Sequence, residues 1–385
     1  MRTLLRLFAA SLLLITLASA ASRTERRPRN REAAGDSEQP GLAEYLSKTE
    51  ADIARIDAAD ARLPRKPIVL GCNLILAHGS TIARVPDDVL LAYADALKEA
   101  GAQRIEINPL VTARDEAQVE AKYTALVNHI RKLGLKVAIN PEATEPSRGG
   151  ITTFEQYQKE AISRYESWAS RLQPDEFVLV HEPTTMSARM HIETRPEQWR
   201  AFIEATASVV RRASPRTRIG AGCFAGTSAR ETPFFEEFSR IPVLQFLTAD
   251  NYVSDAAAIE RMDHMAAVAH SAKKPIYIEE TWRPHFILPG TRHEHGKSME
   301  SESALGFGYK GFEALDAKWL DAMARYAATH GFESMTAFQT RCFFLYVDAK
   351  PTDGPEFDSK VEQAIRHRDR TDTFRAFQRI ANESR

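Results

Sequence analysis

The sequence predicts a single (β/α)8 barrel, and three observations support this prediction. Eight short apolar runs alternate with eight stretches of helical character along the chain. The apolar runs are nearly continuous, which is typical of parallel strands that helices cover. The chain has 385 residues, of which 43% are hydrophobic and 27% charged, so it can bury a large core. Barrels of this class use about 250 residues or more as one domain.

The predicted elements follow one another in a regular order. We expect strands over residues 66–76, 103–111, 135–143, 176–184, 217–225, 243–254, 275–284 and 333–344. We expect helices over residues 86–101, 114–134, 152–172, 195–213, 232–240, 256–272, 312–331 and near 356–382. Pro86 marks the start of the first of these helices, and Thr152 and Thr153 with Glu155 cap the third. A long loop separates the seventh strand from its helix, over about residues 284–311.

An open, doubly wound sheet is the structural alternative. Such sheets usually have fewer strands and show a glycine fingerprint after the first strand. The first strand here runs into "NLILAHGS", which lacks that fingerprint, and "GAGCFAG" has the wrong spacing. We therefore interpret Gly220 and Gly222 as packing residues. The sequence contains no P-loop, CxxC pair or HExxH motif.

The first twenty residues have the pattern of a secretory signal. Arg2 and Arg6 flank the start, an apolar run covers residues 7–17, and Ala18-Ser19-Ala20 offers a cleavage site. The apolar run is too short for a comfortable membrane span, although an uncleaved anchor is the alternative. We expect a secreted or periplasmic protein with a signal peptide at 1–20, a basic linker and short helical segment at 21–62, and the barrel at 63–385.

Charge and cysteine content exclude some functions. The formal net charge is 51 − 52 = −1, and it becomes −3 without Arg2 and Arg6. This balance lacks the basic footprint of a nucleic-acid-binding protein. We interpret the three cysteines, which all lie in apolar runs, as buried free thiols: Cys72, Cys223 and Cys342.

Polar residues gather where the predicted strands end, which is the catalytic face of such a barrel. They are Asn108, Asn140, Glu142, His181, Glu182, Asp250, Asn251, Tyr252, Glu279, Glu280 and Trp282. Side chains alternate along a strand. Glu182 therefore continues the face of Val178 and Val180, and Glu280 continues the face of Ile276 and Ile278. We expect both faces to point to the barrel axis, and Glu279 to meet a neighbouring helix or a basic partner.

Two carboxylates on opposite sides of a barrel mouth suit glycoside hydrolysis. The stretches "VLVHEPT" and "PIYIEETW" resemble the paired motifs of clan A glycoside hydrolases, the retaining "4/7 superfamily", and the resemblance spans residues 66–347. It implies that Glu182 is the general acid/base and Glu280 the nucleophile, acting on an oligo- or polysaccharide with β-linkages. No metal or organic cofactor is implied.

The resemblance also implies roles for neighbouring residues. Tyr252 would donate a hydrogen bond to the nucleophile, and Trp282 would form a sugar-stacking wall. His181 stands where the clan usually has an asparagine that contacts the sugar. A tryptophan that often ends strand eight is absent, and Phe338, Phe343 or Phe344 would substitute for it. We expect Asn108 and Asn140 to contact substrate as well.

Two other functions stay open at this point. The chain could be a metal-dependent barrel isomerase or hydrolase that uses His181, Glu182 and Glu280, with His293 or His295 of the long loop. It could also be a glycan-binding barrel whose acids do not catalyse. A chelator would distinguish the first, and an absence of turnover would distinguish the second.

Overall fold

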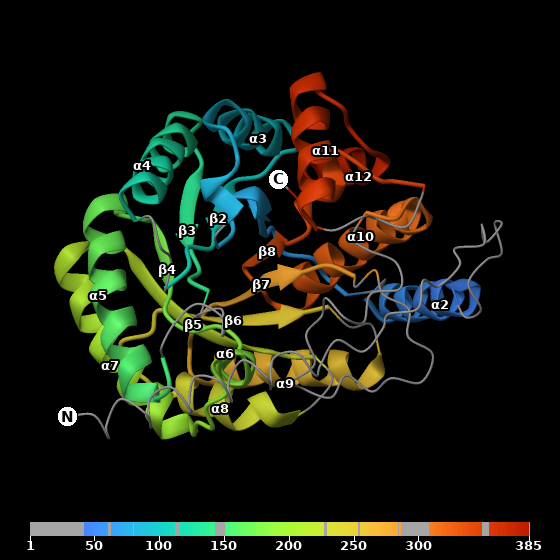
Figure 1. Ribbon diagram of the computed structural model, residues 1–385. Coiled ribbons are helices and arrows are strands. Elements are labelled where there is room, and N and C mark those ends of the chain that lie inside the picture. The colour runs from blue at the N-terminus through green and yellow to red at the C-terminus, as the bar shows by residue number, and fades with distance from the viewer. Residues whose placement is uncertain are drawn as a thin grey trace, which may run out of the picture. The chain divides into compact units, whose positions relative to one another are not determined.

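Eight parallel strands form a closed barrel in the computed structural model (Figure 1). The structure describes residues 42–60, 63–79, 81–111, 116–142, 151–226, 229–252, 255–283, 285, 308–348 and 354–384. Each strand pairs with the next in the chain, and β8 pairs with β1. The strands are β1 Val69–Asn73, β2 Arg104–Ile107, β3 Lys136–Ile139, β4 Glu176–Val178, β5 Arg218–Phe224, β6 Phe246–Asn251, β7 Ile276–Thr281 and β8 Ser334–Ala337. The predicted barrel is confirmed.

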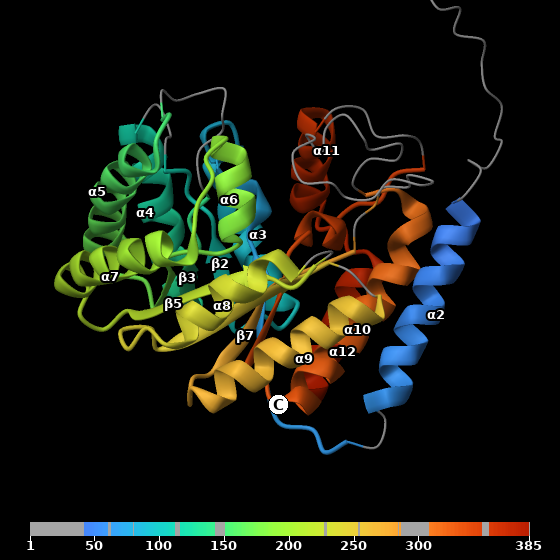
Figure 2. The same cartoon turned by 90° about the horizontal axis from the view of Figure 1, so that it is seen from below.

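Helices surround the barrel in both views (Figures 1 and 2). They are α2 Leu42–Asp60, α3 Asp87–Glu99, α4 Glu116–Lys132, α5 Phe154–Leu172, α6 Pro183–Met190, α7 Pro196–Ala213, α8 Thr232–Ser239, α9 Ala256–Ser271, α10 Glu313–His330, α11 Gly354–His367 and α12 Asp372–Glu383. Within the part of the chain that the structure describes, no helix has the length and apolar character needed to cross a membrane. The expected signal at residues 1–20 lies outside the described residues.

Three local features differ from the prediction. A short helix, α6, lies between β4 and α7, where we expected no helix. The closing helix is two helices, because Arg368 adopts a left-handed conformation (φ 61°) and Thr371 starts α12 by accepting a hydrogen bond from the Phe374 amide. The capping box of α5 uses Thr153 and Gln156 instead of Thr152 and Glu155.

Helix α2 packs beside α10 and is tied to it by side chains. Lys318 and Arg325 of α10 form ion pairs with Glu50 and Asp57 of α2. Arg283, which follows β7, donates to the Thr49 hydroxyl (3.1 Å) and to the carbonyl of Tyr252 (3.0 Å). The N-terminal helix is therefore connected to the ends of β6 and β7.

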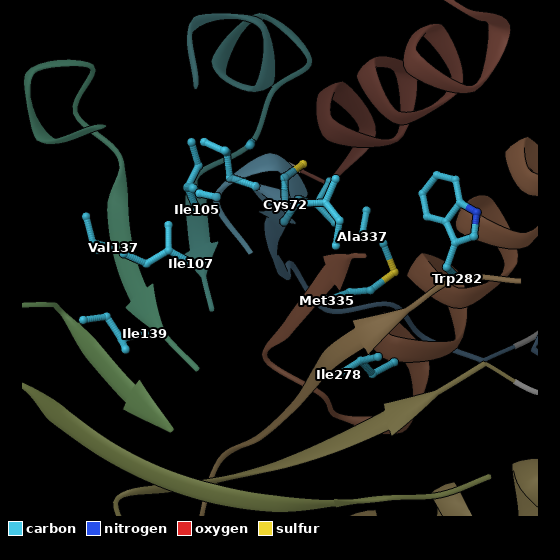
Figure 3. Packing of buried hydrophobic residues seen from close by; sticks show 14 of the residues in the cluster. Cys72, Ile105, Ile107, Val137, Ile139, Ile278, Trp282, Met335 and Ala337 are labelled. Atoms are coloured by element: carbon cyan, nitrogen blue, oxygen red, sulfur yellow. The ribbon is translucent and has the colours of Figure 1, made fainter. Parts of the chain in front are cut away.

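The main apolar core lies between the strands and the helices. Figure 3 shows part of this cluster, including Ile105, Ile107, Val137, Ile139 and Ile278. Because side chains alternate along a strand, the residues between these positions face the barrel axis. The buried apolar residues of the interior form a separate small cluster of Val178, Phe246 and Tyr277.

The rest of the barrel interior is polar and centres on Arg104, which is 1% exposed. Its Nε lies 2.7 Å from Glu176 of β4, and its Nη2 donates to Glu279 of β7. Its Nη1 donates to the Thr336 hydroxyl of β8 at 2.7 Å. Strands β2, β4 and β7 are not neighbours, so these side chains meet across the interior. An interior cation holds several strands together.

The expected orientation of β7 is wrong. Tyr277 and Glu279 face the axis, whereas Ile276 and Ile278 belong to the outer core. The pairing of β7 with β8 shifts register between Ile278 and Thr281. This irregularity breaks the alternation, so Glu280 also turns into the barrel mouth. The partner of Glu279 is basic, as expected, and is Arg104.

The shared face expected for Val178 and Val180 is also wrong, because Val180 belongs to the outer core and Val178 to the interior cluster. The expectations for Gly220 and the cysteines hold. A Cβ atom on Gly220 would lie 2.2 Å from the Phe246 ring, so the absence of a side chain makes room for that ring. Cys72, Cys223 and Cys342 are buried and free. Both observations fit the packing roles that the sequence predicts.

Replacing Arg104 tests the interior ion cluster. Arg104→Leu leaves Glu279 buried without its cation and removes one of the two cations that pair with Glu176, so we expect the free energy of unfolding to fall by about 3–5 kcal/mol, measured by urea denaturation. Arg171→Leu is the matched control, because Arg171 is 55% exposed where it pairs with Glu120, and its loss should cost less than about 1 kcal/mol. Equal losses in the two variants would contradict a structural role of the interior cation.

Candidate active site

Glu280 lies near the end of β7 and is 3% exposed. Tyr252, which follows β6, donates its hydroxyl hydrogen to Glu280 Oε2. The Asn140 amide, after β3, lies 3.4 Å from Glu280 Oε1. The backbone amide of Glu280 donates to Asp250 of β6 at 3.1 Å. Donors from the ends of β6 and β3 thus hold the carboxylate, and Asp250 holds the backbone of Glu280.

Glu182 forms the junction between β4 and helix α6. Its backbone is left-handed (φ 44°, ψ 60°), and its carbonyl accepts the first helical hydrogen bond, from the Met186 amide at 2.9 Å. Its side chain makes no capping bond and is 9% exposed. A non-glycine residue rarely adopts this conformation, and such strain clusters at functional sites. The carboxyl group does not cap the backbone of the helix, although the side chain of Thr185 in α6 forms a hydrogen bond with it that opposes a raised pKa.

The two carboxyl groups share one electrostatic environment. Burial raises the pKa of Glu182 to about 7, with Arg189 opposing this shift and Glu142 adding to it. Burial also raises the pKa of Glu280 well above its ordinary value, and the charge of Glu182 adds further. The hydroxyl of Tyr252 opposes the shift of Glu280. Two carboxyl groups that repel each other in this way titrate as a pair.

Opposing influences act on the pKa of Glu280. Burial and the neighbouring carboxylates outweigh the hydroxyl of Tyr252. The donors still favour Glu280 as the charged member of the pair, because Tyr252 and Asn140 both point hydrogens at it.

A network of asparagine side chains binds the carboxyl group of Glu106 and extends to Glu280. Asn140, Asn108 and Asn73 donate to the same oxygen of Glu106 at 3.2, 3.1 and 3.0 Å. Asn140 therefore bridges Glu106 and Glu280. Asn108 lies in this network and contacts Glu106 and Asn73, so its predicted contact with substrate stays a prediction. Sequence reasoning missed Glu106, although a charged residue within the apolar run "RIEIN" marked an inward-facing position.

A second cluster surrounds His181, next to Glu182. Glu142, just after β3, accepts hydrogen bonds from His78 Nε2 (3.0 Å) and from Arg189 of α6. His181 Nε2 lies 3.9 Å from the same carboxylate. Burial would raise the pKa of Glu142, but Arg189 and His78 hold it well below its ordinary value. Burial lowers the pKa of His181 to about 4, so its ring is neutral near pH 7.

The predicted aromatic residues occupy different environments. Tyr252 packs at ring-centroid distances of 5.8 Å from Phe224 and 5.7 Å from Phe338, and Phe338 lies 6.2 Å from His78. Phe338 is thus next to the tyrosine that holds Glu280. Phe343 instead packs on Phe374 and Phe377 of α12. Phe344 is also buried and lies 4.9 Å from the ring of Tyr93. Of the three candidate rings Phe338 lies beside Tyr252, and its contact with a sugar stays a prediction.

Trp282 lies in the apolar core (Figure 3). It is 1% exposed, and its ring lies 6.0 Å from that of Phe343. A ring buried to this degree offers little open face to a sugar. Its predicted sugar-stacking role stays a prediction.

Among the described residues, one group of three side chains could hold a metal ion. It contains none of the residues named for the metal-dependent alternative. Donor atoms of His285, Asp316 and Cys342 lie within 4.8 Å of one another. His285 Nδ1 accepts from the Gly308 amide at 3.1 Å, and its Nε2 lies 2.9 Å from Asp316. Both ring nitrogens are therefore engaged in hydrogen bonds. His293 and His295 lie outside the described residues.

Comparisons with known proteins find similarity in structure. No family model matches the sequence, and no curated protein matches it. A GH113 β-mannanase from Alicyclobacillus acidocaldarius, in complex with ManMIm, has a TM-score of 0.52 at 13% identity, covering 84% of this chain and 99% of the other. A GH5_18 variant from Streptomyces cattleya, in complex with Manβ1-4GlcNAc, has a TM-score of 0.55 at 14% identity, covering 84% and 81%.

A further similar structure is the endo-1,4-β-mannanase of Rhizomucor miehei, with a TM-score of 0.50 at 11% identity, covering 79% of this chain and 95% of the other. At these identities the likeness establishes the barrel fold. The resemblance to clan A barrels is therefore confirmed at the level of the fold.

The carboxyl group of Glu182 provides a test that needs no substrate. We expect it to titrate with an apparent pKa near 7, because burial disfavours its charged form. Carbon NMR of glutamate-labelled protein, compared with Glu182→Gln, identifies the resonance. Titration near the ordinary value of 4.5 would contradict the electrostatic description of this site.

Proposed function

We propose that this chain is a retaining glycoside hydrolase that acts on a β-linked carbohydrate. The observation that carries the proposal is the meeting of two strand ends: Glu182 follows β4, Glu280 lies near the end of β7, and the charge of Glu182 raises the pKa of Glu280. Retaining enzymes need one protonated and one charged carboxyl group at a single site. A coupled pair with donors aimed at Glu280 meets that requirement.

Each residue then has a defined step. Glu280 attacks the anomeric carbon while Glu182 transfers its proton to the departing glycosidic oxygen, which leaves as an alcohol. Glu182 next removes a proton from water, and that water displaces Glu280 and releases the sugar. Tyr252 and Asn140 hold the nucleophile in place. The neutral ring of His181 can donate a hydrogen bond to a sugar hydroxyl.

The similar structures suggest which carbohydrate to test first. The names of the Alicyclobacillus and Rhizomucor proteins identify β-mannanases, and the Streptomyces complex contains Manβ1-4GlcNAc. We therefore propose β-mannosides and β-1,4-mannans as the first substrates. The predicted signal at residues 1–20 supports action on glycans outside the cytoplasm.

Loss and chemical rescue test the nucleophile. Glu280→Ala should abolish turnover of an aryl β-glycoside, and azide should restore part of it by forming a glycosyl azide of inverted anomeric configuration. Glu204→Ala on the outer helix α7, where the side chain is 48% exposed, should retain full activity. A folded Glu280→Ala protein that small anions do not rescue would remove Glu280 from this role. Activity of the parent that a chelator abolishes and a divalent ion restores would instead support metal-dependent chemistry.

The dependence on the leaving group tests the acid/base. Glu182→Ala should reduce kcat/KM for unactivated oligosaccharides by about 10²–10⁴-fold, but much less for aryl glycosides whose leaving groups need little protonation. Rates of both substrate classes are compared by steady-state kinetics. If both fall equally, Glu182 does not transfer the proton. If the parent turns over neither class but binds glycans, the barrel is a binding protein.

A further inference from the structure

Helix α6 carries the acid/base residue at its start and is anchored at both ends. At its start, Glu231 accepts hydrogen bonds from the amide (2.8 Å) and the hydroxyl of Thr184. Glu231 is 2% exposed and ends the 3-10 helix Ala229–Glu231 that precedes α8. It satisfies an amide that Glu182 leaves unsatisfied, because the Glu182 side chain makes no capping bond.

At the other end, Arg189 donates to Glu142 of the β3 terminus. Arg189 lies seven residues after Glu182, which places both on one side of the helix. Glu142 is 6% exposed and also binds His78. The ion pair thus joins α6 to the strand end that carries Asn140, a contact of Glu280.

We propose that the Glu142–Arg189 pair is a positioning device for the acid/base: it holds α6 against the barrel mouth and sets the balance of charge at the Glu182 carboxyl group. The inference rests on the proposed function for its kinetic part only. Neither residue transfers a proton or attacks substrate in this account. Both act through Glu182.

The charges act on Glu182 in opposite directions. Arg189 favours the charged form of Glu182, and Glu142 favours the protonated form. While they are paired, the two effects oppose each other. Other titratable groups that interact with Glu182 come from the surrounding strand ends and helices: Glu231, Cys223, Asp250, Tyr252 and Glu280. None of these residues is replaced in the variants described next, and Glu142 and Arg189 also act on Glu280 and His181.

The experiment compares Glu142→Gln, Arg189→Gln and the double variant. In Glu142→Gln the freed cation should move the titration of Glu182 to lower pH, and in Arg189→Gln the freed carboxylate should move it to higher pH. The double variant should lie between the two. The pH limits of kcat/KM on the alkaline side should shift in the same directions, and kcat/KM for unactivated substrates at the optimum should fall about tenfold in each single variant.

A purely structural role would not give shifts of opposite sign. Arg171→Gln is the control, because it breaks a comparable pair with Glu120 between α5 and α4, away from the site. Shifts of the same sign, or no shift in either single variant, would overturn the inference. Arg189 is 44% exposed, so its variant should fold even where Glu142→Gln does not, and no upward shift there would overturn the inference as well.

Carbon NMR titration of Glu182 separates this inference from the proposed function. A parent protein that hydrolyses no glycoside would defeat the proposed function. Opposite shifts of the Glu182 resonance would still support the positioning device in that case. Active protein with an unmoved Glu182 resonance would defeat the inference alone.

Discussion

A single buried cation organises the interior of this barrel. Arg104 enters from β2 and binds carboxylates of β4 and β7 and a hydroxyl of β8. In a medium of low polarity such an arrangement is stable only when every member is paired. The interior therefore has to be built around fixed polar geometry, and the apolar packing that stabilises the fold lies mainly outside the strands.

The same need to pair buried polar groups applies at the candidate site. Glu106 lies 3.5 Å from Arg104 on one side and accepts the Asn140 amide on the other. Asn140 in turn contacts Glu280. Burial raises the pKa values of Glu106, Asp250 and Glu280 well above their ordinary values. The barrel mouth thus raises the pKa of its carboxyl groups, and at Glu280 the hydroxyl of Tyr252 acts against this shift.

The sequence predicts the fold well, because eight apolar runs and their helices are strong periodic signals. The sequence also predicts which strand ends meet, because the side chains of Tyr252 and Asn140 both contact Glu280. The orientation of β7 was mispredicted because we expected its apolar face to point to the axis, whereas Ile276 and Ile278 belong to the outer core and Glu279 meets Arg104. A register shift then interrupts the alternation near Glu280. The partners of Glu142 were also inaccessible, since Arg189 and His78 come from segments far apart in the chain. Helix α6 is too short for a periodic pattern to reveal.

Helix α2 supports the ends of β6 and β7 from outside the barrel. Arg283 links the carbonyl of Tyr252 to Thr49 of α2, and its guanidinium lies 5.4 Å from the ring centre of Trp319. Helix α2 belongs to the same compact unit as the strands. A recombinant fragment designed to begin at the first strand would discard the helix that holds Arg283 against Tyr252, so the shortest useful fragment should start ahead of Leu42.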